Sequence, residues 1–80
     1  MKLPRDLSGR ELARALRTLG YTITREVGSH LRLTTSRGGE HHITIPDHAT
    51  LRAGTLAAIL GEVGQHADMT RDDLITLLFG

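Results

Sequence analysis

The stretch Gly28-Ser29-His30-Leu31-Arg32-Leu33 organises this chain, because it joins a turn to the start of a strand. Leu31 and Leu33 alternate with polar residues, and this period of two predicts a half-buried strand whose leucines face inward. His30 and Arg32 then share the outward, solvated face of that strand. The stretch therefore predicts an imidazole next to a cation, a combination suited to acid–base chemistry on a phosphate. An ordinary surface histidine is the alternative interpretation.

The chain has 80 residues, no cysteine and only two aromatic residues, one Tyr and one Phe. This length fits a single domain, residues 1–80, with a modest core. The lack of cysteine excludes disulfides and thiolate chemistry and suits a reducing cytoplasm, which is the expected location. Charged residues interrupt the N-terminus before any apolar run forms, and no apolar stretch is long enough for a bilayer. We therefore expect neither a signal peptide nor a membrane partner.

The net charge of +1 conceals two halves of opposite sign. Residues 1–37 carry eight basic and three acidic residues, whereas residues 38–80 carry two basic and six acidic ones. The basic half indicates a polyanion or an acidic protein as partner, and the acidic half argues against indiscriminate binding. Because bases stack on aromatic rings and few are present, a nucleic acid would be recognised through its backbone and shape.

A capping box of Ser8 and Glu11 opens the first predicted helix, which spans about residues 9–19. A stripe of leucines gives this helix one apolar face, and Gly20 ends it. Three arginines lie roughly opposite that stripe and form a basic ridge: Arg10, Arg14 and Arg17. An ordinary solvated surface is the alternative interpretation of the ridge.

Three strands follow, over about residues 21–26, 30–35 and 41–45, with Ile23 among the inward residues. Tight turns join the strands, so they form an antiparallel meander. Pro46 ends the third strand, because proline cannot donate a hydrogen bond to the ladder.

The register of the strands follows from their inward residues, which must face each other. Pairing Leu33 with Ile43 places His30 beside Pro46, and so near Asp47 and His48. Pairing Leu33 with Ile23 in the same way places Glu26 directly across from His30. A carboxylate in that position would stabilise the protonated imidazole.

Five histidines in a chain of this length raise the question of a metal site. Adjacent residues of a strand point to opposite faces, so His41 and His42 cannot share an ion. In the inferred register His42 lies opposite Thr34, roughly 13 Å from His30 at the usual rise of a strand. The spacing therefore argues against a metal site, and we expect no cofactor.

Two more helices are predicted in the second half of the chain. The first begins between Arg52 and Thr55 and ends near Gly64, and Gly54 and Thr55 form a candidate anion site with the free N–H groups of its first turn. The same residues could simply cap the helix. A short helix follows from Thr70. The order of elements predicts an α+β fold, α-β-β-β-α with an additional short C-terminal helix, which is the layout of a double-stranded-RNA-binding domain.

Within this layout the chain resembles the HicA (YcfA-like) toxins, small mRNA interferases of bacterial and archaeal type II toxin–antitoxin pairs. The resemblance covers about residues 7–66 and rests on the following motifs: Gly20-Tyr21, Arg25-x-x-Gly28-Ser29-His30, Pro46-x-His48 and Gly54-Thr55-Leu56 with Ile59-Leu60. The chain departs from the family at Arg52, where a lysine is common, and at Glu26, where an amide is more familiar.

The resemblance implies a metal-independent endoribonuclease that cleaves mRNA, with His30 as its catalytic residue. The residues expected to support His30 are Ser29, Gly28, Glu26 and His48. The residues expected to contact RNA are Arg10, Arg14, Arg17, Arg25, Arg32, Arg52, Gly54 and Thr55. A HicB-like antitoxin is the implied protein partner, and a heterotetramer or a larger assembly is one option for the complex.

The chemistry of RNA cleavage fits a histidine. The 2′-hydroxyl must lose its proton as it attacks the adjacent phosphate, and a 2′,3′-cyclic phosphate results. Histidine, with a reference pKa near ~6.5, exchanges such a proton near neutral pH, and Arg25 or Arg32 could stabilise the charge on phosphorus. His48 is a candidate for the acid at the leaving group, with packing of its loop as the alternative. Two other functions fit the composition: a non-catalytic RNA-binding module, and a protein-interaction domain that binds an acidic partner.

Overall fold

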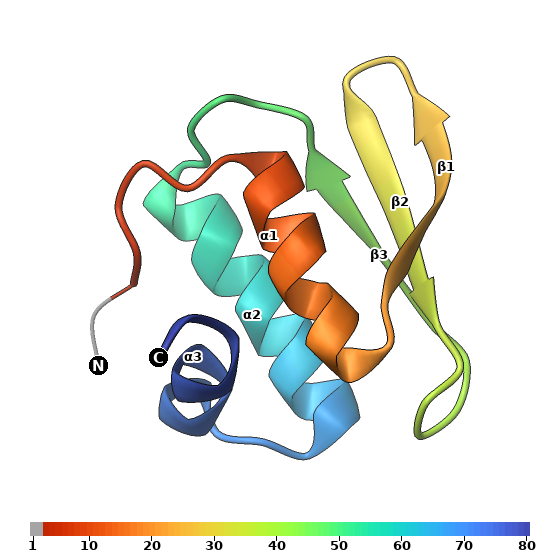
Figure 1. The fold of residues 1–80 in the computed structure, drawn as a ribbon, viewed down its shortest axis with the longest axis vertical. Coiled ribbons are helices and arrows are strands. Elements are labelled where there is room, and N and C mark those ends of the chain that lie inside the picture. Colours follow the sequence, from red (N-terminus) through yellow and green to blue (C-terminus); the bar gives the residue numbers. More distant parts are fainter. Residues whose placement is uncertain (1–2) are drawn as a thin grey trace.

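The structure is a computed structural model that describes residues 3–80, and it shows a three-stranded antiparallel sheet with the helices packed on one face (Figure 1). In chain order its elements are α1 (Gly9–Ala15), the 3₁₀ helix η1 (Leu16–Leu19), β1 (Thr22–Val27), β2 (His30–Thr35), β3 (His41–Pro46), α2 (Ala53–Ala67) and α3 (Arg71–Phe79). The strands lie in the order β1-β2-β3. The predicted α+β class is confirmed, and the arrangement is compatible with a double-stranded-RNA-binding layout plus a C-terminal helix.

The first helix begins and ends as its sequence predicts. The Ser8 side chain accepts a hydrogen bond from the Glu11 N–H at 3.0 Å, and the Ser8 N–H donates to Glu11 Oε1 at 2.9 Å. That second bond holds the pKa of the Glu11 carboxyl below its usual value. The final turn tightens into η1, and Gly20 follows it in the left-handed conformation with φ of 84°.

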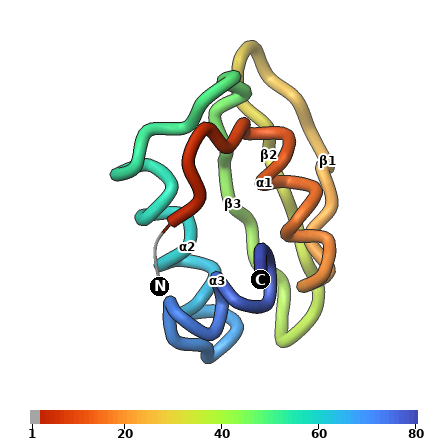
Figure 2. Tube along the Cα trace, turned by 60° about the vertical axis from the view of Figure 1, so that its left-hand side comes forward, coloured from red at the N-terminus to blue at the C-terminus, as the bar shows by residue number. Residues whose placement is uncertain are grey.

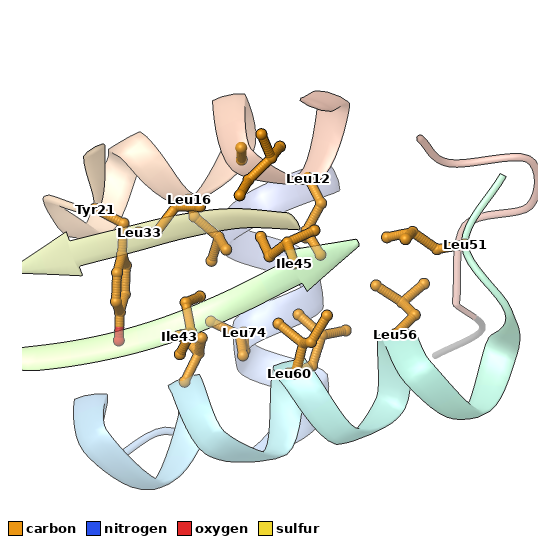
Figure 3. Packing of buried hydrophobic residues seen from close by; sticks show 14 of the residues in the cluster. Leu12, Leu16, Tyr21, Leu33, Ile43, Ile45, Leu51, Leu56, Leu60 and Leu74 are labelled. Atoms are coloured by element: carbon orange, nitrogen blue, oxygen red, sulfur yellow. The ribbon is translucent and has the colours of Figure 1, made fainter. Parts of the chain in front are cut away.

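The core lies between the sheet and the helices (Figure 3). Its strand residues are those predicted to face inward from β2 and β3: Leu31, Leu33, Ile43 and Ile45. Its helix residues come from all three helices and from η1, and include Leu12, Leu16, Leu56, Leu60, Val63 and Leu74. Within residues 3–80 no helix covers the opposite face of the sheet, since α1, α2 and α3 all pack on the core side; Figure 2 shows the same trace from another side.

The predicted register of β2 and β3 is confirmed. Leu33 pairs with Ile43, and His30 pairs with Pro46. His42 lies opposite Thr34, so the alternation of faces along β3 is also as expected.

The predicted register of β1 holds only in its first half. Ile23 pairs with Leu33 as expected, but a bulge directly after Ile23 adds one residue to β1. Because a one-residue shift moves the following side chains to the other face, Glu26 lies opposite Leu31 rather than His30. The prediction that Glu26 faces His30 is therefore wrong. Ile23 itself is 41 % exposed, since β1 is an edge strand that the helices cover only in part.

Gly9 marks the closest approach of α1 to the sheet. Its N–H donates to the carbonyl of His48 at 3.0 Å. A Cβ at this position would lie 2.0 Å from the carbonyl oxygen of Pro46, so only glycine fits. Within residues 3–80, none of the helices has the length and apolar character needed to cross a membrane.

Candidate functional site

A tight turn delivers His30 to the sheet. Gly28 has φ of 57°, a left-handed conformation that favours glycine, and its missing side chain faces open space. The carbonyl of Ser29 accepts a hydrogen bond from the N–H of Asp47 at 2.7 Å, which ties the turn to the segment after β3. His30 then stands as the first residue of β2, held by backbone contacts on both sides.

The His30 side chain lies on the uncovered face of the sheet, because Leu31 beside it is buried in the core. It is exposed, and its cross-strand neighbours are Val27 and Pro46, neither of which carries a charge or a side-chain hydrogen-bonding group. Within the part of the chain that the structure describes, the imidazole has neither a hydrogen bond nor an ion pair. Both ring nitrogens are therefore available to a ligand.

Two arginines lie one row further along the same face. Arg32 is two residues beyond His30 on β2, and Arg25 is its direct partner on β1. Both are exposed, and the structure assigns neither guanidinium an ion pair among residues 3–80. The bulge in β1 produces this pairing, since it moves Arg25 onto the face of Arg32.

The carboxylates predicted to gather around His30 are bound elsewhere. Arg10 contacts Glu26 Oε1 at 2.6 Å and Asp47 Oδ2 at 3.0 Å. The hydrogen bond that Arg10 donates to Glu26, followed by the one that it donates to Asp47, raises the pKa of the Arg10 guanidinium. Glu26 therefore pairs with an arginine of α1 and does not support His30 as predicted.

The basic ridge of α1 is exposed as predicted, but its first member is neutralised. Arg10, Arg14 and Arg17 line a groove of about 350 Å³ between α1 and β1, together with Ala13, Thr22 and Ile23. Arg10 is occupied by the two carboxylates, whereas Arg14 and Arg17 have no ion pair within the described residues. The cationic part of the ridge is thus limited to its second half.

The start of α2 differs in detail from the anion site that the sequence suggests. The N-cap residue is Arg52, whose side chain makes no capping hydrogen bond, and Gly54 faces open space. Thr55 lies inside the first turn, so it does not cap the helix. Thr55 instead lines a groove of about 420 Å³ along β3 with Arg32 and His42, and with Thr44 and Glu62 among the other lining residues. Thr55 and Arg32 therefore line the same groove, and Arg52 and Gly54 lie outside it.

His48, the candidate second acid, is exposed in the loop that follows β3. Its backbone carbonyl accepts the hydrogen bond from Gly9 that fixes α1 against this loop. That contact involves the main chain alone and leaves the imidazole free of it.

A polar row crosses the uncovered face, and the sequence predicts only part of it. The Thr24 and Thr34 hydroxyls lie 2.9 Å apart, the Thr34 hydroxyl is 2.8 Å from His42 Nδ1, and His42 Nε2 is 3.1 Å from Glu40 Oε2. The register of β2 and β3 already predicts that Thr34 meets His42. Thr24 is the residue at the bulge, between the pairs formed by Ile23 and Arg25, and local sequence does not reveal the bulge.

The covered face holds a second cluster of polar side chains that the sequence does not predict. The Tyr21 hydroxyl lies 2.7 Å from His41 Nδ1, and the His41 ring stacks on that of His66 with centroids 4.4 Å apart. His66 Nε2 in turn lies 3.0 Å from the carbonyl oxygen of Arg37. Burial lowers the pKa of His41, and the neighbouring His66 acts in the same direction. Across residues 3–80, no group of three or more potential ligands lies close enough together to hold a metal ion.

The fold and this site define a class of protein: a small α+β domain, compatible in layout with a double-stranded-RNA-binding domain, with an exposed histidine and two arginines on the bare face of its sheet. Comparison with protein families is more specific. Residues 9–65 match the family described as HicA toxin of bacterial toxin–antitoxin systems, and the chain belongs to this family. Neither the curated proteins nor the solved structures contain a match to the chain. The protein is therefore the toxin of a toxin–antitoxin pair, and the resemblance noted in the sequence is confirmed.

Proposed function

We propose that this toxin is a metal-independent endoribonuclease that cleaves mRNA, with His30 as its general acid–base residue. The observation that carries the proposal is the state of His30. It is exposed on the bare face of the sheet, held in place by its backbone, and free of side-chain partners within the described residues. A histidine that served packing alone would be expected to have such partners, as His41 and His66 do.

The reaction needs proton transfer and charge stabilisation, and the bare face offers groups for both. An O2′–P bond forms and the P–O5′ bond breaks, while the 2′-hydroxyl proton passes to a base and the leaving 5′-oxygen takes up a proton. His30 would serve as the base, and the positive charge of Arg25 and Arg32, one row away, would favour the extra negative charge on the phosphoryl oxygens through space. His48 is our candidate for protonating the leaving oxygen, with water as the alternative source.

A HicB-like antitoxin is the partner that we propose on the basis of family membership. Because the reactive side chains lie on one uncovered face, a partner that covers this face would block the reaction without distorting the domain. The proposal makes no use of a cofactor.

The test of this function is His30→Ala. We expect loss of growth inhibition and a fall in RNA cleavage of roughly 10²–10⁴-fold, which is the usual contribution of one positioned acid or base. The melting temperature should stay close to wild type, because truncation of an exposed side chain changes stability by no more than about 0.5 kcal/mol. His66→Ala is the matched control: it removes a histidine from the covered face and should leave cleavage intact. A folded His30→Ala protein that is still fully toxic would refute the proposal.

The products and the metal requirement give a second measurement on the wild-type protein. Cleavage should persist in excess EDTA, and the products should end in 2′,3′-cyclic phosphate. An enzyme that EDTA inactivates and that zinc or magnesium restores would show that a metal takes part.

A further inference from the structure

The bulge in β1 determines which charges lie on the uncovered face. Without it, the register set by Ile23 and Leu33 would place Glu26 opposite His30 and would turn Arg25 toward the helices. With it, Glu26 turns toward α1 and binds Arg10, while Arg25 moves opposite Arg32. The extra residue thus removes a carboxylate from the bare face and adds a guanidinium to it, an effect typical of bulges beside functional sites.

Within residues 3–80 neither of the paired arginines forms an ion pair, although Glu62 of α2 lines the same groove as Arg32. Like charges directly opposite each other on neighbouring strands are destabilising. The acidic side chains nearest in sequence are engaged elsewhere, since Arg10 binds Glu26 and Asp47, and His42 binds Glu40. An anion between Arg25 and Arg32 would relieve their repulsion, and a phosphate matches the fork geometry of two guanidinium groups.

The bare face is organised in rows that follow β2. His30 stands in the first row, the Arg25–Arg32 pair in the second, and the hydrogen-bonded Thr34 and His42 in the third. Alternate residues of a strand are about 6.7 Å apart, at ~3.3–3.4 Å per residue. That interval is close to the spacing of neighbouring phosphates in an extended nucleic acid strand. Each row can therefore meet one phosphate of a chain that runs along β2.

Aromatic side chains are lacking on this face. The two aromatic residues of the sequence are Tyr21, which is buried, and Phe79, which lies in α3 on the helical side. Stacking of bases on tyrosine or phenylalanine rings, a usual basis of single-strand binding, therefore contributes nothing here. A strand on this face would be held by its phosphates and read with little regard to base identity.

We propose that the uncovered face binds one extended, single strand of RNA along β2, and that Arg25 and Arg32 together clamp the phosphate next to the one on which His30 acts. This inference rests on the proposed function and adds the form of the substrate and the residues that position it. It places the RNA on the bare face rather than in the groove beside Arg14 and Arg17, which also carries uncompensated positive charge.

Binding of a short, single-stranded 2′-O-methyl RNA of mixed sequence tests the proposal, because this probe lacks the attacking hydroxyl and cannot be cleaved. Affinity is measured by fluorescence anisotropy over a range of salt concentrations. In Arg25→Gln/Arg32→Gln the slope of log K against log[salt] should flatten by about 0.7, the value for the loss of one phosphate contact with a single strand. Arg14→Gln/Arg17→Gln removes the same charge from α1, where the sequence predicts RNA contacts, and tests that competing surface; if the RNA lies on the bare face, the slope of this variant is unchanged.

The melting temperature of Arg25→Gln/Arg32→Gln should equal or exceed that of the wild type, because the substitution removes a repulsion. An unchanged slope in this variant, a loss confined to the α1 variant, or tighter binding of the corresponding duplex would each overturn the proposal. These outcomes are independent of catalysis. If the RNA does not lie along β2, the wild-type protein still cleaves RNA. If the protein is not a ribonuclease, the probe still binds to the bare face and no cleavage is seen.

Discussion

His30 and His41 begin neighbouring antiparallel strands, so they lie at opposite ends of the sheet, and they face opposite sides of it. His41 is half-buried, hydrogen-bonded to Tyr21 and stacked on His66. His30 is exposed and has no side-chain partner within residues 3–80. The covered face therefore uses His41 as a packing residue with its polar atoms satisfied, whereas His30 on the bare face is free for a ligand.

The same difference extends to the charged residues. Toward the helices, Glu26 and Asp47 are matched with Arg10. On the bare face, Arg25 and Arg32 oppose each other without a carboxylate between them. Arg10 is compensated by carboxylates and the Arg25–Arg32 pair is not, and this difference separates a structural charge from candidate functional ones. We expect substitutions on the covered face to change stability and those on the bare face to change activity.

The largest effect on the covered face is expected at Gly9. Gly9→Ala places a methyl group 2.0 Å from the carbonyl oxygen of Pro46, so α1 must move off the sheet. Overpacking of this kind costs about 1–3 kcal/mol, and each kcal/mol lowers the melting temperature of a domain of this size by about 4–8 °C. Thermal unfolding followed by circular dichroism measures the change.

Gly61→Ala is the control for that substitution. Gly61 lies in the exposed part of α2, and a Cβ there meets nothing within 4 Å. Alanine should therefore stabilise the protein by about 0.5–1 kcal/mol, through its better helix propensity. A Gly9→Ala protein as stable as the wild type would mean that α1 can approach β3 in another way.

A smaller effect is expected from pH, through His41. Burial lowers the pKa of His41 in the folded protein, with His66 and His42 acting in the same direction and Glu62 against them. The folded state thus favours the neutral ring, so its contribution to stability is complete above pH ~6.5, the usual value for an unfolded chain. This contribution is lost as the pH falls below that value, because the unfolded state then binds more protons.

Urea unfolding at a series of pH values measures this loss. In His41→Gln the part of the decline that begins near pH ~6.5 should be absent, while the decline caused by carboxylates at lower pH remains. Superimposable pH profiles for the two proteins would show that the folded state accommodates a charged His41. His30→Ala, which alters the bare face, should retain the decline seen in the wild type.

The smallest effect is expected for Glu26→Gln, and it distinguishes the two possible registers. Because Glu26 binds Arg10 on the side of α1, the substitution should shift the NMR resonances of the Arg10 guanidinium and leave the ring resonances of His30 in place. Stability should change little, since ion pairs between exposed side chains contribute little. A shift of the His30 ring resonances with no shift of the Arg10 guanidinium resonances would instead support the register without a bulge.

Much of this architecture could be predicted from local pattern. The capping box at Ser8 and Glu11 and the alternation of Leu31 and Leu33 lead directly to α1 and β2. Both signals are local and depend on the intrinsic periods of helix and strand. The position of His30 on the outer face follows from the same alternation. His30 could therefore be proposed as a catalytic residue without tertiary information.

The surroundings of His30 were harder to predict. A bulge leaves no reliable mark in the sequence, and a single extra residue exchanges the faces of Arg25 and Glu26. The edge position of β1 has a similar effect on Ile23, which alternates like a core residue and yet is 41 % exposed. Errors in predicting the site thus arise at β1, where the helices constrain the register least.

By itself, the sequence determined the order of the elements, the inward residues of β2 and β3, and the turn that presents His30, because each depends on contacts between near neighbours along the chain. Tertiary structure alone decided which charges are compensated. Arg10 reaches Glu26 and Asp47 from α1, and Arg25 reaches the row of Arg32 through the bulge. These are contacts between segments far apart in the sequence, and packing of the helices against only one face of the sheet leaves the uncompensated pair exposed to solvent.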